Sequence, residues 1–455
     1  EKSNTEPITS IAPNMIDSST VYLAFKHDGS TFLIDFEPYT IQSTWTNYIN
    51  SLQTNGLVQS YDLDYILSPP GYPNSVFKAS THIGYIDFII PSGYNACDIT
   101  YGRLADDPTQ VKINNVDVDS TTDNLKTYTA TNLVSGQIIR IYEVHGQINR
   151  IIKLFYYNSQ TSYTVNFPED TTCDILIVGG GGAGGKSIGA GGGAGGVVYV
   201  TGYTMNGIYK IKVGNGGINT ETSSDVSNLG AGRNGFDSVI LNNTNNIINY
   251  QNQFDFKAFG GGGGGSYSGN NHGNYQPSSG GSTGGVAMDN TGTPKVKTIN
   301  ISAIQGNTYW NKETSQFVSG GYIGGNGTQG TAAGGGGGAG TQGVSASSDG
   351  ANPGNGGNGI ITDITGIQKG YAGGGGGSGS SNFGLGGIVT IDGITTKLGG
   401  DGINYINTNI NAKSGTLHTG SGGGGAGYDP SGDLAGSGGS GIVIIRYSST
   451  KTTEN

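Results

Sequence analysis

The sequence predicts a mainly β protein, in which jelly-roll-like β-sandwich domains carry a polyglycine-II helix bundle inserted in the C-terminal sandwich. Short segments rich in Ile, Val, Tyr and Thr recur between turn residues, as in antiparallel β domains. Only 8 of the 87 glycines lie in residues 1–170. Charged residues are 12% of the chain, whereas disordered tails are commonly highly charged. We therefore expect the glycine-rich part to be ordered.

Composition and pattern divide the chain into three predicted domains. Residues 1–75 are a small segment with strands and one helix, residues 76–160 a jelly-roll-like β-sandwich, and residues 161–455 a glycine-rich domain. The strands expected in the first domain are Val21–Lys26 and Thr31–Phe36. Prolines at the end of this domain mark a connection to the next.

One amphipathic helix is predicted in the first domain. The apolar residues that share one helical face are Trp45, Tyr48, Ile49 and Leu52. Ser43 or Thr44 can cap the start of the helix, and Gly56 can end it in the left-handed conformation.

The two predicted sandwiches consist of short strands. In the second domain these are Tyr85–Ile90, Cys97–Tyr101, Val111–Val118, Lys126–Leu133, Gln137–Val144 and Ile148–Tyr157. In the third they are Tyr163–Phe167, Cys173–Val178, Gly196–Val200, Tyr209–Val213, Phe236–Leu241 and, near the C-terminus, Ile442–Tyr447. Because strand sequence occurs at both ends of the third domain, the glycine tracts are predicted to be insertions in one sandwich.

The glycine tracts can be ordered only if their backbone groups bond to one another. Ordering costs about 1–2 kcal/mol per residue, and glycine has no side chain to bury in return. A paired N–H and C=O contribute about 0.5–1.5 kcal/mol. Neighbouring glycine helices with three residues per turn can form such pairs, and without Cβ atoms they approach closely. Collagen is excluded, because the tracts lack a G-X-Y repeat and contain few prolines.

An ordered set of glycine motifs carries a family resemblance. The motifs are CDILIVGGGGAGG (173–185), GAGGGAGGVVYV (189–200), YKIKVGNGG (209–217), FGGGGGG (259–265), YAGGGGG (371–377) and GGSGIVIIRY (438–447). Over roughly residues 160–450 the set resembles a glycine-rich domain of phage, giant-virus and marine microbial surface proteins. It is similar in kind to the TNF-like and glycine-rich extracellular region of anaplastic lymphoma kinase receptors, and to polyglycine adhesins at the tail-fibre tip of some T-even-type phages. The resemblance implies a structural, adhesive or ligand-binding role without catalysis.

These features predict a non-catalytic structural protein of a virion surface, fibre or extracellular filament. We expect it to self-assemble as a homo-oligomer, and TNF-like domains suggest a trimer by analogy. The alternative is an adhesin, a module that binds other virion or cell-surface proteins or glycans. A second alternative is a nucleotide-binding enzyme. No cofactor or metal is expected, and Glu1 at the start permits the removal of a leader.

The charge balance disfavours two kinds of partner. The formal net charge is −10, and the 22 basic residues are scattered singly. Nucleic acids and anionic membrane surfaces require clustered basic residues. Insertion into a membrane is not expected either, because no apolar run approaches the ~20 residues that a spanning helix needs.

Three patterns linked to nucleotide binding or catalysis occur in the glycine tracts. They are the phosphate-binding loop pattern Gly180-x4-Gly185-Lys186-Ser187, the dinucleotide pattern at Gly179, Gly181 and Gly184, and the nucleophile pattern G-x-S-x-G at Ser187 and Ser282. Each pattern requires a helix directly after it. The glycines that follow predict no helix, so we attribute the matches to glycine content.

The other candidate site residues are few. Cys97 and Cys173 are either one disulfide or two thiols. Three sequons, at Asn242, Asn300 and Asn326, permit glycosylation.

Acidic residues and tyrosines provide weaker candidates. Asp117, Asp119 and Asp123 could bind Ca²⁺, but a solvated hairpin is the preferred interpretation. Glu143 and His145 could form an acid–base pair, although a surface pair is preferred. Tyrosines suit interfaces and sugar stacking, with core or interface packing as the default; those noted are Tyr85, Tyr94, Tyr101, Tyr267 and Tyr275.

Overall fold

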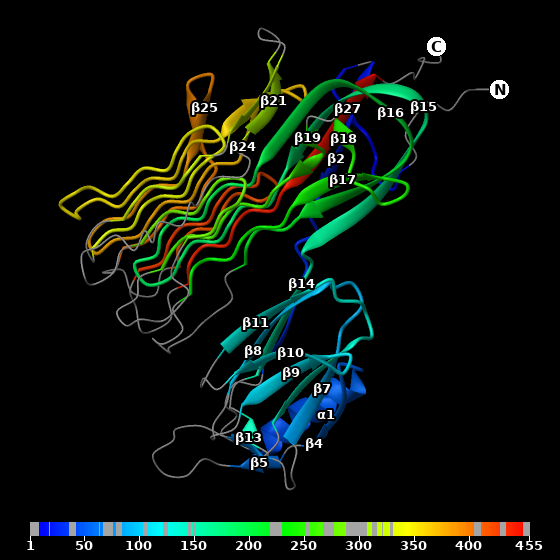
Figure 1. Cartoon of the computed structure of the whole chain (residues 1–455), viewed down its shortest axis with the longest axis vertical. Helices are drawn as coiled ribbons and strands as arrows, with labels where there is room; N and C mark the ends of the chain where they lie inside the picture. The colour runs from blue at the N-terminus through cyan, green and yellow to red at the C-terminus, as the bar shows by residue number, and fades with distance from the viewer. Residues whose placement is uncertain are drawn as a thin grey trace. The chain divides into compact units, whose positions relative to one another are not determined.

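The computed structural model of the chain divides into two compact units (Figure 1). The glycine-rich unit contains residues 1–28 and 160–455, and the sandwich unit contains residues 29–159. The structure describes residues 9–17, 19–35, 42–62, 64–66, 76–78, 84–102, 108–121, 126–143, 147–148, 152–218, 230–250, 254–266, 277–287, 307–311, 316–320, 322–327, 331–404, 411–427 and 434–448.

The units divide the chain after residues 28 and 159, whereas the sequence predicts divisions after residues 75 and 160. Strand β2 (Thr20–Lys26) pairs along its whole length with β27 (Ile442–Ser448), so it belongs to the glycine-rich unit. Strand β3 (Thr31–Asp35) pairs with β14 (Lys153–Tyr157) in the sandwich unit. Strands β2 and β3 are neighbours in the sequence and belong to one predicted domain, but their pairing with distant strands places them in different units.

The sandwich unit contains two main antiparallel sheets, with strand orders β10-β9-β12-β7-β4 and β11-β8-β14-β3. Their remaining strands are β4 (Val58–Asp62), β7 (Gly84–Ile89), β8 (Ala96–Tyr101), β9 (Thr109–Ile113), β10 (Val116–Thr121), β11 (Lys126–Thr131) and β12 (Ile138–Glu143). A small third sheet consists of β5 (Asp64–Ile66), β6 (Val76–Lys78) and β13 (Gln147–Ile148). Both main sheets contribute side chains to one core, including Phe88 and Leu154. The mainly β sandwich class is confirmed, and the jelly-roll label stays a prediction.

Helix α1 (Gln42–Thr54) covers this core with Ile49 and Leu52, as predicted. It begins before Ser43 and Thr44, so the prediction that one of them caps it is wrong. The chain leaves the helix at Gly56, whose φ of +69° is the predicted left-handed conformation.

Two strands predicted in this unit are interrupted. The stretch Val111–Val118 forms the hairpin of β9 and β10, in which Asn114 and Asn115 have φ of 48° and 64°. Two left-handed residues in succession are typical of the type I′ turn that fits a two-residue hairpin. The stretch Ile148–Tyr157 is divided between β13 and β14.

The glycine-rich unit is built on one nine-stranded sheet, whose main path is β1-β2-β27-β15-β16-β17-β20. Its other strands are β1 (Asn14–Met15), β15 (Gln160–Val178), β16 (Val197–Gly214), β17 (Ser238–Asn242), β20 (Lys257–Ala258), β21 (Asn307–Asn311) and β22 (Gln316–Gly320). Three small hairpins lie outside this sheet: β18 (Asn249–Tyr250) with β19 (Phe254–Asp255), β23 (Ile360–Thr362) with β24 (Lys369–Tyr371), and β25 (Ile388–Ile391) with β26 (Ile394–Lys397).

Strands β15 and β16 each join two segments that the sequence predicts as separate strands. They form a long antiparallel hairpin, visible in Figure 1, with register shifts between Phe167 and Thr171 and between Cys173 and Ile175. Residues from both ends of β15, such as Val165 and Ile177, pack in the same hydrophobic cluster. The sheet therefore folds over its own core, because the register shifts bend β15 and allow both of its ends to pack in the same cluster.

The glycine segments are cross-linked through their backbones. Along segment 179–185, successive N–H groups donate to three different neighbours in a repeating order. The N–H groups of residues 179, 182 and 185 donate to segment 190–196, those of residues 180 and 183 to segment 233–236, and those of residues 181 and 184 to segment 436–439, at N–O distances of 2.8–3.0 Å. Segment 189–196 repeats this alternation with three further neighbours. A period of three matches an extended helix with three residues per turn, so each segment bonds to neighbours on three sides.

The spacing between these segments leaves no room for side chains. Residues 179–196 connect β15 directly to β16 and are almost entirely buried, and Figure 1 shows such segments running side by side. Alanines are found where a methyl group meets other apolar groups: Ala194 packs against the sheet, and Ala190 packs with Ala287 and Ala333. Glycine elsewhere allows close backbone approach.

A buried carboxylate joins the end of strand β26 to two neighbouring segments of the glycine-rich unit. The Asp401 side chain is 5% exposed and accepts hydrogen bonds from Lys397 at 2.7 Å, from Lys413 at 3.0 Å and from the Gly386 N–H at 3.0 Å. Burial raises the pKa of Asp401, but these bonds outweigh it and hold the pKa below its ordinary 3.8.

We expect this carboxylate to make the glycine-rich unit sensitive to acid. Because the pKa of Asp401 is lower in the folded state, the ionised carboxylate stabilises the unit at every pH above the unfolded-state pKa. This stabilisation is lost as the pH falls through the folded-state pKa. Thermal unfolding followed from about pH 6 to about pH 3 should show a smaller decrease in Tm for Asp401→Asn than for the wild type. Equal decreases would contradict the role assigned to Asp401.

Candidate functional site

The phosphate-binding pattern lies inside the cross-linked glycine segments. The N–H groups of residues 179–185 all donate to carbonyls of other segments. These residues include every glycine of the two nucleotide patterns that precedes Lys186. Lys186 is 7% exposed, and Ser187 and Ile188 have φ of 51° and 48° in a tight turn. The next segment is extended and hydrogen-bonded to its neighbours, not helical. These amides are therefore engaged within the fold, where a nucleotide loop would direct them at phosphate.

Both serines of the nucleophile pattern are buried. Ser282 is completely buried, and its hydroxyl donates to the Gly338 carbonyl at 3.0 Å. Ser187 is 4% exposed. A nucleophilic serine must be presented on a strand-to-helix turn, and neither residue lies on one.

The two cysteines are buried thiols in separate cores. Cys97 lies in the core of the sandwich unit and Cys173 in that of the glycine-rich unit. The disulfide alternative between them is therefore wrong for this structure. Burial, followed by the nearby charge of Asp174, raises the pKa of the Cys173 thiol to about 12, which suppresses the reactive thiolate.

The sequons differ in accessibility. The Asn242 side chain is half-buried, and its Oδ1 accepts bonds from the N–H groups of Thr244 and Asn246 at 3.0 Å. Asn326 is exposed, which suits a glycan acceptor. Asn300 lies outside the described residues.

The aspartates of the predicted hairpin form local pairs. Asp119 accepts from the Tyr101 hydroxyl at 2.7 Å and from Lys126 at 2.5 Å, and Asp117 accepts from the Tyr142 hydroxyl at 2.8 Å. Within the described part of the chain, no group of three or more His, Cys, Asp or Glu residues is arranged to hold a metal ion. The residues Asp123, His145, Tyr267, Tyr275 and the Glu143 side chain lie outside the description.

The tyrosines noted in the sandwich unit serve packing. Tyr101 belongs to the core, and Tyr94 packs against it from a partly buried position. The Arg140 guanidinium lies over the Tyr85 ring, 4.4 Å from the centroid of the ring. Core packing thus holds for Tyr101 and Tyr94, whereas the half-buried Tyr85 forms a cation–π contact outside this core.

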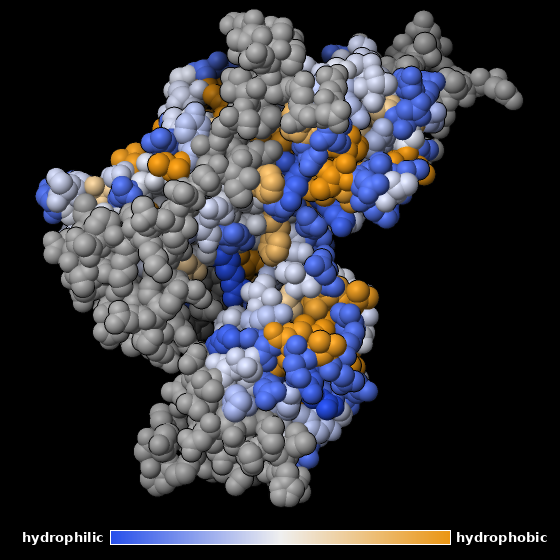
Figure 2. Space-filling view, viewed as in Figure 1, coloured by the Kyte–Doolittle hydropathy of each residue, from blue (hydrophilic) through white to orange (hydrophobic). Residues whose placement is uncertain are grey.

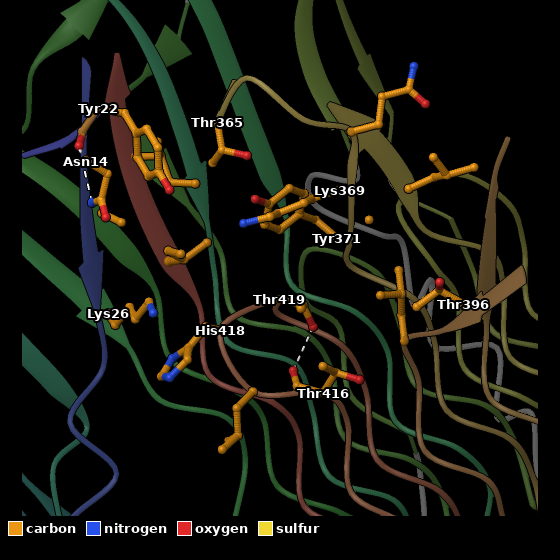
Figure 3. Close-up of a pocket in the computed structure, with 18 residues that line it drawn as sticks. Asn14, Tyr22, Lys26, Thr365, Lys369, Tyr371, Thr396, Thr416, His418 and Thr419 are labelled. Carbon is orange, nitrogen blue, oxygen red and sulfur yellow. Dashed lines mark hydrogen bonds between the residues drawn. The ribbon is translucent and has the colours of Figure 1, made fainter. Parts of the chain in front are cut away.

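A pocket of about 580 Å³ lies where the glycine segments leave the sheet. We call it the base pocket, because segments on its lining, including residues 369–371, residues 416–419 and residues 442 and 444, adjoin glycine segments (Figure 3). Its floor is one face of β2 and β27. Tyr22, Ala24 and Lys26 share that face because side chains of a strand alternate between the two sides of a sheet.

The walls of the base pocket come from β24, the β25–β26 hairpin and the turn at residues 416–419. In this turn, His418 has a φ of 59°, and its Nδ1 lies 3.1 Å from the Ser440 hydroxyl. Burial and the nearby Lys26 lower the pKa of His418, and Figure 3 shows these two side chains next to each other. His418 is thus kept neutral at neutral pH and acts as a hydrogen-bonding ring.

Tyr371 is the buried aromatic residue of the pocket, with 3% of it exposed. Burial, followed by the influence of Tyr22, raises the pKa of its hydroxyl to about 12, so it stays protonated and can donate a hydrogen bond. The residues of this pocket were missed by the sequence analysis. They come from separated segments, and only the general excess of tyrosine pointed toward such a site.

The fold and its backbone cross-links define a class of protein: a β protein whose strands carry glycine-rich insertions. Residues 158–448 match the family described as glycine-rich domain, so the chain belongs to that family. The resemblance predicted over residues 160–450 is confirmed at this level. No curated protein matches the chain. Among the described residues, none forms a helix that is both long and apolar enough to cross a membrane.

Proposed function

We propose that this chain is a non-catalytic structural protein of a virion surface, fibre or extracellular filament, and that its glycine segments form a polyglycine-II bundle. The observation that carries the proposal is the period of three in the hydrogen bonds of the glycine segments. A body cross-linked in this way holds its shape through backbone groups, so its stiffness depends little on side chains. A stiff unit of this kind is suitable as a spacer or as a building block of a larger assembly.

Self-assembly would use surfaces outside the bundle interior. Figure 2 shows hydrophobic residues gathered in patches among hydrophilic ones. Exposed large apolar residues in the glycine-rich unit include Met15, Ile367, Ile394 and Leu417. Exposed apolar patches commonly mark protein–protein contact sites, which supports a homo-oligomer as the working unit.

Sedimentation and electron microscopy test the structural role. We expect the full chain to sediment as a homo-oligomer, with a trimer as the symmetric candidate, and to show rings or filaments in negative stain. Charged substitutions at Ile394 and Met15, two exposed apolar residues that do not line the base pocket, should shift the distribution toward the monomer. A wild-type protein that remains monomeric at high concentration would contradict self-assembly.

A second function, that of a binding module, is favoured by one observation. The base pocket combines aromatic, hydroxyl and basic side chains on a concave surface, the usual composition of a small-molecule site. The two functions are compatible, because the pocket lies beside the bundle rather than within it.

A further inference from the structure

We propose that the base pocket binds a saccharide of one or two rings that carries a carboxylate. This inference goes beyond the structural role and does not depend on it. It rests on the charge of the lining residues, on the nature of the walls and on the size of the pocket.

The charge of the pocket is opposite to that of the chain. The whole chain has 32 acidic and 22 basic residues, yet the lining, as far as the structure describes it, includes Lys26 and Lys369 and no Asp or Glu. Within the described residues, neither lysine ammonium forms an ion pair. A concave surface with positive charge concentrates anions, and an ammonium group forms strong hydrogen bonds with a carboxylate.

The walls suit a ring with hydroxyl groups. Tyr22 comes from the sheet floor and Tyr371 from β24, and the apolar Ile442 and Ile444 also line the pocket. The half-buried Tyr22 ring can pack against the apolar C–H face of a sugar, whereas Tyr371, of which 3% is exposed, can contribute its hydroxyl as a hydrogen-bond donor. Thr396 and three further threonines, with Gln368, supply both donors and acceptors for sugar hydroxyls.

The size and the absence of arginine narrow the ligand class. A volume of about 580 Å³ is within the range of pockets that enclose small organic ligands. Arginine is the usual residue for planar, bidentate recognition of phosphate, and none is found among the described residues that line the pocket. A small inorganic anion would leave the aromatic and aliphatic walls unused. A carboxylated sugar engages both the lysines and the walls.

The test is a titration of the full chain, followed by NMR or calorimetry, with glucuronic acid and N-acetylneuraminic acid. Glucose and N-acetylglucosamine provide rings without charge, and acetate provides charge without a ring. We expect an acidic sugar to bind at least about tenfold more tightly than its neutral counterpart and than acetate, with an affinity that falls as salt is added.

Substitutions then locate the site. Lys26→Gln and Lys369→Gln should each weaken binding of the acidic sugar by about tenfold. Lys212→Gln changes a lysine of the same unit that does not line the pocket, so it should leave the affinity unchanged. The thermal unfolding of all three variants should match the wild type, which separates lost binding from lost fold.

Three results with the wild-type protein would overturn the proposal. They are no saturable binding of either acid, equal affinity for acidic and neutral sugars, and acetate binding as tightly as the acidic sugars. An unchanged affinity in both pocket-lysine variants would place the ligand elsewhere and would equally reject the site.

Discussion

Replacing Gly192 by alanine is expected to lower the free energy of unfolding of the glycine-rich unit by about 3–5 kcal/mol. A Cβ atom at this position would lie 2.2 Å from the carbonyl oxygen of Gly182 and 2.7 Å from that of Ala183, so the segments must move apart. The Gly192 N–H donates to Gly423 at 2.9 Å, and its carbonyl accepts from Gly375 at 2.9 Å. Both bonds would lengthen, and differential scanning calorimetry measures the loss.

Two glycines provide controls, Gly207 in the same unit and Gly29 in the sandwich unit. A Cβ at Gly29 meets no atom within 4 Å, and its φ is not left-handed, so Gly29→Ala should change stability by less than about 0.5 kcal/mol. Gly207 also has open space but a φ of +86°, so Gly207→Ala should cost about 1–2 kcal/mol through backbone strain alone. If Gly192→Ala is no more harmful than Gly207→Ala, the close approach of the segments is not what stabilises the unit.

Removal of the Arg140 guanidinium should clearly destabilise the sandwich unit. Its Nε and Nη2 each lie 2.7 Å from an oxygen of Asp87, whose side chain is 5% exposed. Arg140→Met leaves this carboxylate with a single bond, from the Ser60 hydroxyl at 2.9 Å. We expect a loss of about 2–4 kcal/mol in urea unfolding, less than for a fully buried pair because Arg140 is 36% exposed.

A pair on the same sheet provides the comparison. Lys112 lies opposite Arg140 in the strand register, and its ammonium is 3.7 Å from Asp117, whose side chain is 64% exposed. Lys112→Met should therefore cost less than about 1 kcal/mol. Adding Asp87→Asn to Arg140→Met should recover part of the loss, because the unpaired charge is removed. Equal costs for Lys112→Met and Arg140→Met would contradict the importance of burial.

Much of the fold could be predicted from local sequence pattern. The helix face at Ile49 and Leu52 and the left-handed Gly56 follow from spacing and backbone preference, and both are present. Strand ends were predicted within a few residues for segments such as β8 and β27. The hairpin at Asn114 was missed, because apolar alternation continues across a turn that the two asparagines permit.

The candidate site could not be predicted in the same way. Patterns at Lys186, Ser187 and Ser282 match known motifs, but the structure buries these residues among cross-linked segments. The base pocket, in contrast, has no local pattern. Tyr22 and Tyr371 are far apart in sequence, and only the folded chain places both on one cavity.

The sequence by itself determined that strands alternate with glycine tracts and that those tracts need partners, because glycine has only backbone groups to bond. The tertiary structure decided which segments are partners, where the two units divide, and that β2 joins β27 across most of the chain. The physical reason is that the backbone N–H group is chemically the same in every glycine. Any glycine can bond to any other, so the choice of neighbour follows from the strands that position the segments and from the space left between them.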